Sequence, residues 1–129
     1  MPPRRRAALF ATVLSFGSIC AVPPHALAEK PAEELTIQQR DAIEENMAPA
    51  MVLPETAIWQ FAPIKPYLGS QRLACGAVNY QSAMRRYMGF HRFYAILDDD
   101  RVILAQIQND GQDPAGRLRN KLDFLCGKA

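Results

Sequence analysis

Hydrophobic residues follow a helical spacing at both ends of the region after residue 35, and an extended pattern between these ends. Ile37, Ile43 and Met47 lie near one face of a helix whose remaining surface is mainly charged or amide-bearing. Thr36 can cap such a helix, and Gln39 stands three residues later, where a capping box has its second member. The pattern therefore predicts a helix over residues 37–47.

Four segments rich in β-forming residues follow this helix, at residues 57–62, 71–80, 90–97 and 101–108. Asp98, Asp99 and Asp100 form the short connection between the last two segments, which predicts a β-hairpin there. Residues 81–88 are polar and basic, and they are compatible with either a wide turn or a short helix.

A second helix is predicted near the C-terminus. Asp113 followed by Pro114 is typical of a helix start, with a capping carboxylate and proline at the first helical position. Three leucines then recur at helical spacing: Leu118, Leu122 and Leu125. Together these elements predict an α+β fold with an N-terminal helix, an antiparallel sheet of about four strands and a C-terminal helix.

Residues 1–28 have the pattern of a signal peptide. Three arginines at positions 4–6 precede an uncharged apolar stretch, and Ala26, Leu27 and Ala28 form a small-x-small cleavage site. We therefore expect a signal peptide at residues 1–28, a flexible lead-in at 29–35 and a single α+β domain at 36–129, in the periplasm or secreted. The apolar stretch is about 16 residues long, shorter than a span of about 20, so no stable membrane span is expected after cleavage.

The cysteines predict a disulfide. Cleavage removes Cys20 and leaves Cys75 and Cys126, which in an oxidising compartment are expected to pair. The bond would tie the C-terminal helix to the second strand and, by closing a loop of about 50 residues, stabilise the fold by about 4 kcal/mol. A catalytic or metal-binding thiol is the alternative, although no C-x-x-C or Cys/His cluster accompanies either cysteine.

Cleavage also changes the charge. The whole chain has a net charge of +2, but three of its 15 bases and none of its 13 acids precede residue 29, which leaves 12 bases and a net charge of −1. This near-neutral balance gives no reason to expect nucleic-acid binding, which depends on phosphate neutralisation. The acids are concentrated in residues 29–55, as an acidic arm before a mildly basic body.

The segment from Cys75 to Tyr94 carries a recognisable pattern. Cys75, Gly76, Val78 and Asn79 form C-G-x-V-N, and G-F and F-Y follow at residues 89–90 and 93–94. The pattern resembles small exported bacterial proteins of uncharacterised function. The resemblance implies the same helix-then-sheet layout, but it brings no activity, catalytic residue or cofactor. Residues 82–86 replace a segment that is often glycine-rich in such proteins.

The same segment contains the candidate binding residues. Five aromatic side chains occur between residues 80 and 94, beside Arg85, Arg86 and Arg92, and aromatic and arginine residues are enriched at binding hot spots. A packed core would explain many of the aromatics equally well, and Asn79 can instead satisfy backbone groups of the following turn. The hypothesis is a binding surface for an envelope or extracellular protein, made by Asn79, Tyr80, Arg85, Arg86, Tyr87, His91 and Arg92.

Two other functions stay open. His91 with Asn79 or a nearby carboxylate could serve a small hydrolase or ligand-binding enzyme, although no complete catalytic set or nucleophile motif is present. A structural envelope component that assembles through its acidic arm is the second alternative. Asp98, Asp99 and Asp100 lack the repeat of a calcium loop, so neither a metal nor a cofactor is expected.

Overall fold

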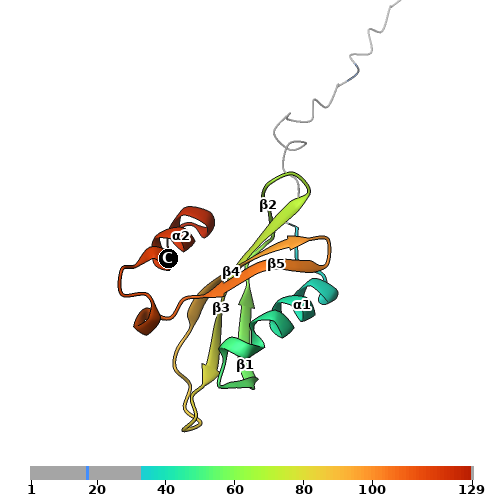
Figure 1. Cartoon of the computed structure of the whole chain (residues 1–129). Helices are drawn as coiled ribbons and strands as arrows, with labels where there is room; N and C mark the ends of the chain where they lie inside the picture. Colours follow the sequence, from blue (N-terminus) through green and yellow to red (C-terminus); the bar gives the residue numbers. More distant parts are fainter. Residues whose placement is uncertain (1–16, 18–32, 129) are drawn as a thin grey trace, which may run out of the picture. The chain divides into compact units, whose positions relative to one another are not determined.

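The computed structural model describes Gly17 and residues 33–128. The predicted signal peptide lies outside these described residues apart from Gly17, as do residues 29–32 of the predicted lead-in. Residues 33–128 form an antiparallel sheet with one helix against each of its faces (Figure 1). The α+β class and the antiparallel sheet are therefore confirmed.

The elements follow one another in a simple order. Helix α1 (Ile37–Met47) continues into the short 3-10 helix η2 (Ala48–Ala50). The strands are β1 (Leu53–Phe61), β2 (Lys65–Pro66), β3 (Gln71–Gln81), β4 (His91–Asp98) and β5 (Arg101–Ile107). A second 3-10 helix, η3 (Asp110–Gln112), precedes helix α2 (Arg117–Cys126). The strand order among the described residues is β1-β3-β4-β5, and β2 also pairs with β3.

The sheet has five strands where the sequence predicted about four. The additional strand, β2, is two residues long, and Lys65 and Pro66 oppose Leu73 and Arg72 of β3. The sequence pattern does not predict β2, because a strand is recognised from several alternating residues and this one has two, of which one is proline. Strand β1 also begins earlier than predicted, at Leu53, and its register with β3 is irregular between Leu53 and Ile58.

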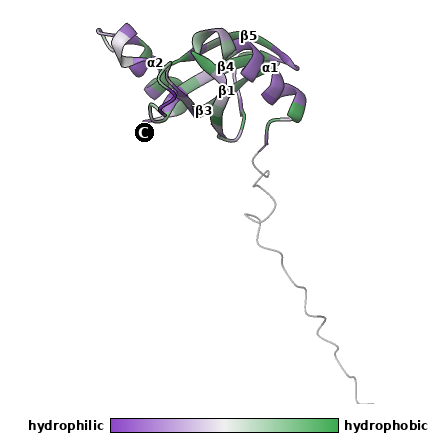
Figure 2. Cartoon of the chain, turned by 90° about the horizontal axis from the view of Figure 1, so that it is seen from below, coloured by the Kyte–Doolittle hydropathy of each residue, from purple (hydrophilic) through white to green (hydrophobic). Residues whose placement is uncertain are grey.

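The main core lies between α1 and the sheet. The capping box of α1 is complete, since the Gln39 backbone N–H donates to the Thr36 hydroxyl and the Thr36 N–H donates to the Gln39 side chain. The helix buries Ile43 and Met47, whereas much of its remaining surface is hydrophilic (Figure 2). Beneath it, Phe93 is fully buried. Its ring meets the stacked rings of β1 edge-on, at 5.4 Å from Trp59 and 5.7 Å from Phe61.

A smaller core lies on the opposite face, under α2. Leu122 of α2 is fully buried against a set of sheet residues, Leu73, Cys75, Tyr94 and Ile96. The Cys75–Cys126 disulfide joins the end of α2 to β3, with a Cα–Cα distance of 5.9 Å. The predicted disulfide is confirmed, and it is consistent with an oxidising environment.

Helix α2 begins later than predicted. Asp113 and Pro114 lie in a turn closed by a hydrogen bond from the Gly116 N–H to the Asp113 carbonyl, and the helix begins only at Arg117. Gly116 takes the left-handed conformation, with φ 66°, which separates the turn from the helix. The Asp113 carboxylate still caps the helix from outside by accepting from the N–H groups of Leu118 and Arg119. The cap residue was recognised, but its distance from the helix was wrong.

The described part of the predicted lead-in is packed rather than flexible. Leu35 is buried in the main core, and Glu33 forms an isolated bridge with Ile64. The Glu33 carboxylate also makes an ion pair with Arg72. The folded unit therefore begins before residue 36. The sequence reading missed the core position of Leu35 because charged residues lie beside it.

Candidate functional site

The connection between β3 and β4 projects beyond the sheet, at the bottom of Figure 1. We call residues 82–90 the β3–β4 tip. Three of the predicted binding residues, Arg85, Arg86 and Tyr87, lie in it and are exposed. The sequence allowed a wide turn or a short helix here, and the structure has a turn.

Backbone hydrogen bonds define the shape of the β3–β4 tip. The Arg85 N–H donates to the Ser82 carbonyl at 2.8 Å, and the Ser82 N–H donates to the Arg86 carbonyl at 2.9 Å. Gln81, the last residue of β3, and Tyr87 form an isolated antiparallel bridge between this turn and the sheet. Arg85 lies at φ 56°, in the left-handed region that a non-glycine residue adopts mainly in tight turns.

Side chains attach the tip to the sheet. The Asn79 side-chain oxygen accepts from the Gly89 N–H at 3.1 Å, which is the structural role that the sequence suggested for this asparagine. The Tyr87 hydroxyl donates to the Thr56 carbonyl of β1 at 3.2 Å. The Thr56 hydroxyl in turn accepts from the Gln81 N–H at 2.9 Å. The tip therefore has a defined conformation supported by two strands.

The β3–β4 tip exposes apolar side chains despite this ordered backbone. Met84 is 77% exposed, Met88 58%, and Tyr87 and Phe90 each 48%. The exposed guanidinium groups of Arg85 and Arg86 lie among them in sequence. Four large apolar residues within seven positions form a cluster, whereas scattered single exposures are ordinary on a protein surface. Such a cluster beside arginines has the composition of an interaction surface.

The other predicted binding residues do not share one surface. Tyr80 and His91 lie on the α1 face of the sheet, where their rings are 5.8 Å apart. Asn79 and Arg92 lie on the α2 face, because neighbouring residues of a strand point to opposite faces. The proposed single aromatic and arginine sheet face is therefore split in two.

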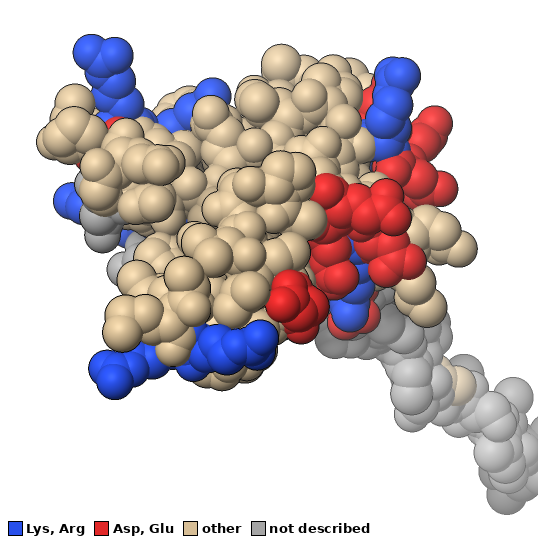
Figure 3. All heavy atoms as spheres, turned by 60° about the horizontal axis from the view of Figure 1, so that its bottom comes forward, with Lys and Arg blue, Asp and Glu red and all other residues tan. Residues whose placement is uncertain are grey.

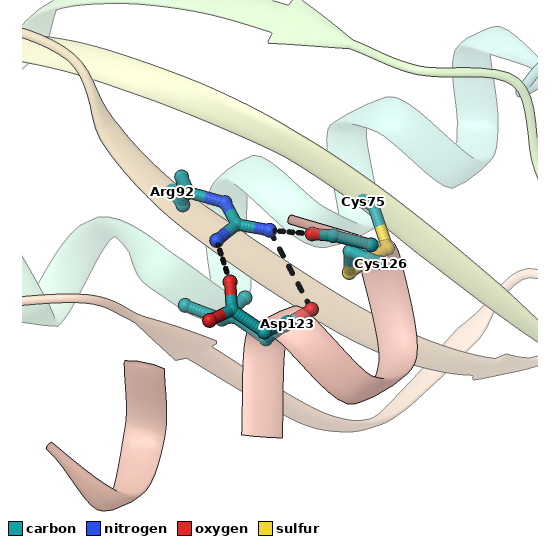
Figure 4. The surroundings of a disulfide bond; sticks show 6 residues. Cys75, Arg92, Asp123 and Cys126 are labelled. Atoms are coloured by element: carbon teal, nitrogen blue, oxygen red, sulfur yellow. Dashed lines mark hydrogen bonds and ion pairs between the residues drawn. A yellow bond between two sulfur atoms is a disulfide. The ribbon is translucent and has the colours of Figure 1, made fainter. Parts of the chain in front are cut away.

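Arg92 contacts its own chain. Its guanidinium donates to the Asp123 carboxylate at 2.7 Å and to the carbonyls of Leu122 and Gly127. Figure 4 shows this group pointing at the last turn of α2, close to the Cys75–Cys126 disulfide. Arg92 is therefore occupied in holding the end of α2 against β4.

The geometry does not assemble the enzymatic pair considered from the sequence. His91 opposes Val78 and lies on the α1 face, whereas Asn79 lies on the α2 face and is bonded to Gly89. Within residues 33–128, no group of three or more His, Cys, Asp or Glu side chains is placed to hold a metal ion. None of the described helices is long and apolar enough to cross a membrane.

Acidic side chains gather on one side of the molecule, at the right of Figure 3. Helix α1 contributes Asp41, Glu44 and Glu45, and the β4–β5 turn lies beside it, since the Gln39 side chain donates to the Asp99 carbonyl at 3.2 Å. The pKa of Glu44 is raised by partial burial and by the nearby Asp41 carboxylate, against the opposing effect of Arg40. The β3–β4 tip precedes β4 and the β4–β5 turn follows it, so the basic tip and the acidic turn lie at opposite ends of this strand.

Three apolar residues of the β3–β4 tip were missing from the sequence-based site: Met84, Met88 and Phe90. The available signal was their position in a segment already interpreted as a turn. Hydrophobic residues in a turn have few routes to the core, so their presence there indicates exposure.

Comparison of the chain with protein-family models, with curated proteins and with solved structures gave no significant match.

Proposed function

We propose that this protein is an exported, non-enzymatic binding protein whose β3–β4 tip recognises another envelope or extracellular protein. Export is inferred from the leader pattern of residues 1–28, and the Cys75–Cys126 disulfide is consistent with it. The observation that supports binding is the tip itself, where ordered backbone presents Met84, Tyr87, Met88 and Phe90 to solvent.

The order of the tip matters for affinity. A loop that is already fixed before binding loses less conformational entropy when a partner immobilises it. The bonds from Tyr87 to Thr56 and from Gly89 to Asn79 supply that order without burying the apolar side chains. Methionine adapts to irregular surfaces, aromatic rings add contact area, and the two arginines can pair with carboxylates. This combination suits a protein surface with an apolar patch and acidic neighbours.

A double substitution at the tip tests this function. Met84→Ser with Arg86→Glu removes one exposed apolar side chain and reverses one charge, while leaving the hydrogen-bonding Tyr87 intact. The matched control is Leu68→Ser with Lys65→Glu, which makes the same two changes at exposed positions outside the tip. Both variants should melt within a few degrees of the wild type, since exposed substitutions usually change stability by less than about 0.5 kcal/mol.

The assay is covalent crosslinking of the exported, tagged full chain in its source organism, followed by quantitative mass spectrometry. We expect a partner whose recovery falls at least about tenfold with the tip variant and stays unchanged with the control, a difference of about 1.4 kcal/mol or more. Equal recovery of every crosslinked protein by the tip variant and the wild type would refute the proposal.

A further inference from the structure

Strand β5 forms one edge of the described sheet, and its hydrogen-bonding pattern shows which residues face outward. The Gln108 N–H donates to the Arg92 carbonyl at 2.7 Å. In an antiparallel pair, bonded and non-bonded positions alternate. Gln106 opposite Tyr94 is therefore a bonded position, whereas Ala105 and Ile107 direct their N–H and C=O groups away from β4.

The residues that carry these outward groups line a pocket. Ala105, Gln106 and Ile107 form one wall of a pocket of about 460 Å³. Other walls come from Ala50 of η2, from the η3 segment and from the start of α2, including Arg117 and Lys121. No intramolecular acceptor for the N–H of Ala105 or Ile107 occurs among residues 33–128. We call Ala105, Gln106, Ile107, Arg117 and Lys121 the β5 edge site.

The features that usually protect exposed strands occur only at the start of this edge. Natural proteins block edge strands with charged residues or proline, because free N–H and C=O groups can pair with another chain. Arg101 begins β5, and the shift in register between Ile96 and Leu97 leaves Ile103 as a bulged residue. Residues 104–107 contain neither charge nor proline, and Leu104 is 38% exposed. The second half of β5, residues 104–107, therefore offers an unprotected edge beside the pocket and is suited to accept a further strand.

The polar groups around this edge favour an acidic ligand. Arg117 and Lys121 line the pocket, while the Asp113 carboxylate, which also lines it, accepts from two backbone N–H groups of α2. The Tyr94 hydroxyl donates to the Gln106 side-chain oxygen at 2.6 Å, which leaves the Gln106 amide N–H groups as donors. The edge site therefore offers cations and N–H donors to a carboxylate-bearing chain.

We propose that the β5 edge site binds an extended, acidic peptide segment of a partner protein, which adds to the sheet as a further strand. In this mode main-chain hydrogen bonds supply affinity and side-chain contacts supply specificity. Here Ala105 and Ile107 provide the main-chain bonds, and Arg117 and Lys121 select carboxylates. The site lies on β5 and α2, away from the β3–β4 tip, so it goes beyond the proposed function and does not depend on it.

The first test is selection of random peptides of seven residues, the length of β5, against the exported full chain. We expect enriched sequences that alternate apolar and polar residues and contain Asp or Glu. Their synthetic versions should slow hydrogen exchange at the Ala105 and Ile107 amides. N-methylation of alternate peptide residues should weaken binding at least about tenfold, because it removes main-chain hydrogen bonds without altering the protein.

Protein variants locate the site. Ala105→Pro removes one outward N–H without breaking a β4–β5 bond, and proline is tolerated on a strand edge. Arg117→Glu with Lys121→Glu reverses the charge and leaves the strand unchanged. Each should lower peptide affinity at least about tenfold, as expected for lost charge-assisted or main-chain bonds. The tip variant Met84→Ser with Arg86→Glu is the control and should bind normally.

Three results would overturn the proposal. One is selection that enriches no acidic extended peptide. Another is enriched peptides whose affinity survives both Ala105→Pro and the charge reversal, or falls with the tip variant. The third is a dimer of the wild type in sedimentation that Ala105→Pro dissociates, because that would assign the edge to a second copy of this chain.

Discussion

The attachment of α2 through the Cys75–Cys126 disulfide leads to a quantitative prediction about stability. The perturbation is replacement of both cysteines by alanine, with the reduced wild type as a companion that leaves no void. The bond joins residues separated by 51 positions in sequence. In the chain-entropy description this crosslink removes roughly 14 cal/mol/K from the unfolded chain, so its loss should cost about 4 kcal/mol near room temperature.

Other contacts of α2 set the scale for this number. Leu122 is fully buried, and burial of such a side chain contributes about 1.5–3 kcal/mol. The ion pair of Arg92 with Asp123 is partly exposed, and its side chains retain 22% and 30% of their accessible surface, so screening by solvent keeps its contribution small. The disulfide is therefore the strongest single attachment of α2. Its loss should remove a large part of a typical domain stability of about 5–15 kcal/mol.

The assay is guanidinium unfolding followed by the fluorescence of Trp59, which is partly buried and packs against the main core beside Phe93. The oxidised and reduced wild type should differ by about 4 kcal/mol in the free energy of unfolding. Cys75→Ala with Cys126→Ala should add up to about 1 kcal/mol for the small cavity that it leaves. A difference below about 1 kcal/mol between oxidised and reduced protein would refute the reasoning, because α2 would then be held by its other contacts.

Two further substitutions probe packing and charge. Gly76→Ala places a Cβ 2.1 Å from the Gln60 carbonyl oxygen and 2.8 Å from the Phe93 ring, so it should destabilise the fold by about 3 kcal/mol or more in denaturant unfolding; a change below about 1 kcal/mol would contradict the close approach of β1. Glu44→Gln should raise the melting temperature at pH 7, because a raised folded-state pKa makes the charged form unfavourable in the folded protein. This gain should disappear as the pH falls through that raised pKa towards the ordinary value of 4.5, and a pH-independent gain would exclude the charge as its cause.

Local patterns predicted part of the fold well. The hairpin of β4 and β5 followed from two β-rich segments joined by three aspartates, and the structure pairs Asp98 with Arg101 beside that turn. The disulfide followed from cysteine count and compartment alone. Both inferences need only short-range sequence or arithmetic, which is why they were recoverable without knowledge of the tertiary packing.

Reasoning from local patterns was wrong or incomplete for the start of α2, for β2 and for Leu35. Asp113 was recognised as a helix cap, but residues 113–116 form a turn before α2, which the order Asp, Pro, Ala, Gly also fits. Strand β2 exists because Lys65 and Pro66 meet β3, a contact without a periodic signal of its own. Leu35 looked like part of a charged lead-in, although the main core buries it.

Some features of the candidate site could also be predicted from the sequence, whereas others required the tertiary structure. Strand alternation already implies that Asn79 and Tyr80 point to opposite faces, so their grouping as one surface could have been rejected from the sequence. The engagement of Arg92 with α2 could not, because Asp123 lies 31 residues away. The free N–H groups of Ala105 and Ile107 also required the register of β4 and β5.

The two proposed surfaces should respond differently to reduction of the disulfide. Helix α2 supplies Arg117 and Lys121 to the β5 edge site, and the disulfide is its strongest attachment to the sheet. The β3–β4 tip is held instead by bonds to Asn79 and Thr56, which do not involve α2. The disulfide can be reduced at low temperature and without denaturant, so that the sheet stays folded. This reduction should therefore loosen the β5 edge site and leave the β3–β4 tip unchanged.

The selected acidic peptide and the crosslinked partner provide the two readouts. With the reduced wild type, peptide affinity should fall at least about tenfold, because loosening α2 removes charge-assisted bonds from the edge. Partner recovery through the tip should stay the same, and unchanged Trp59 fluorescence would show that the main core is intact. Equal losses at both surfaces with intact fluorescence would contradict their structural independence. Unchanged peptide affinity would mean that α2 keeps its position without the disulfide.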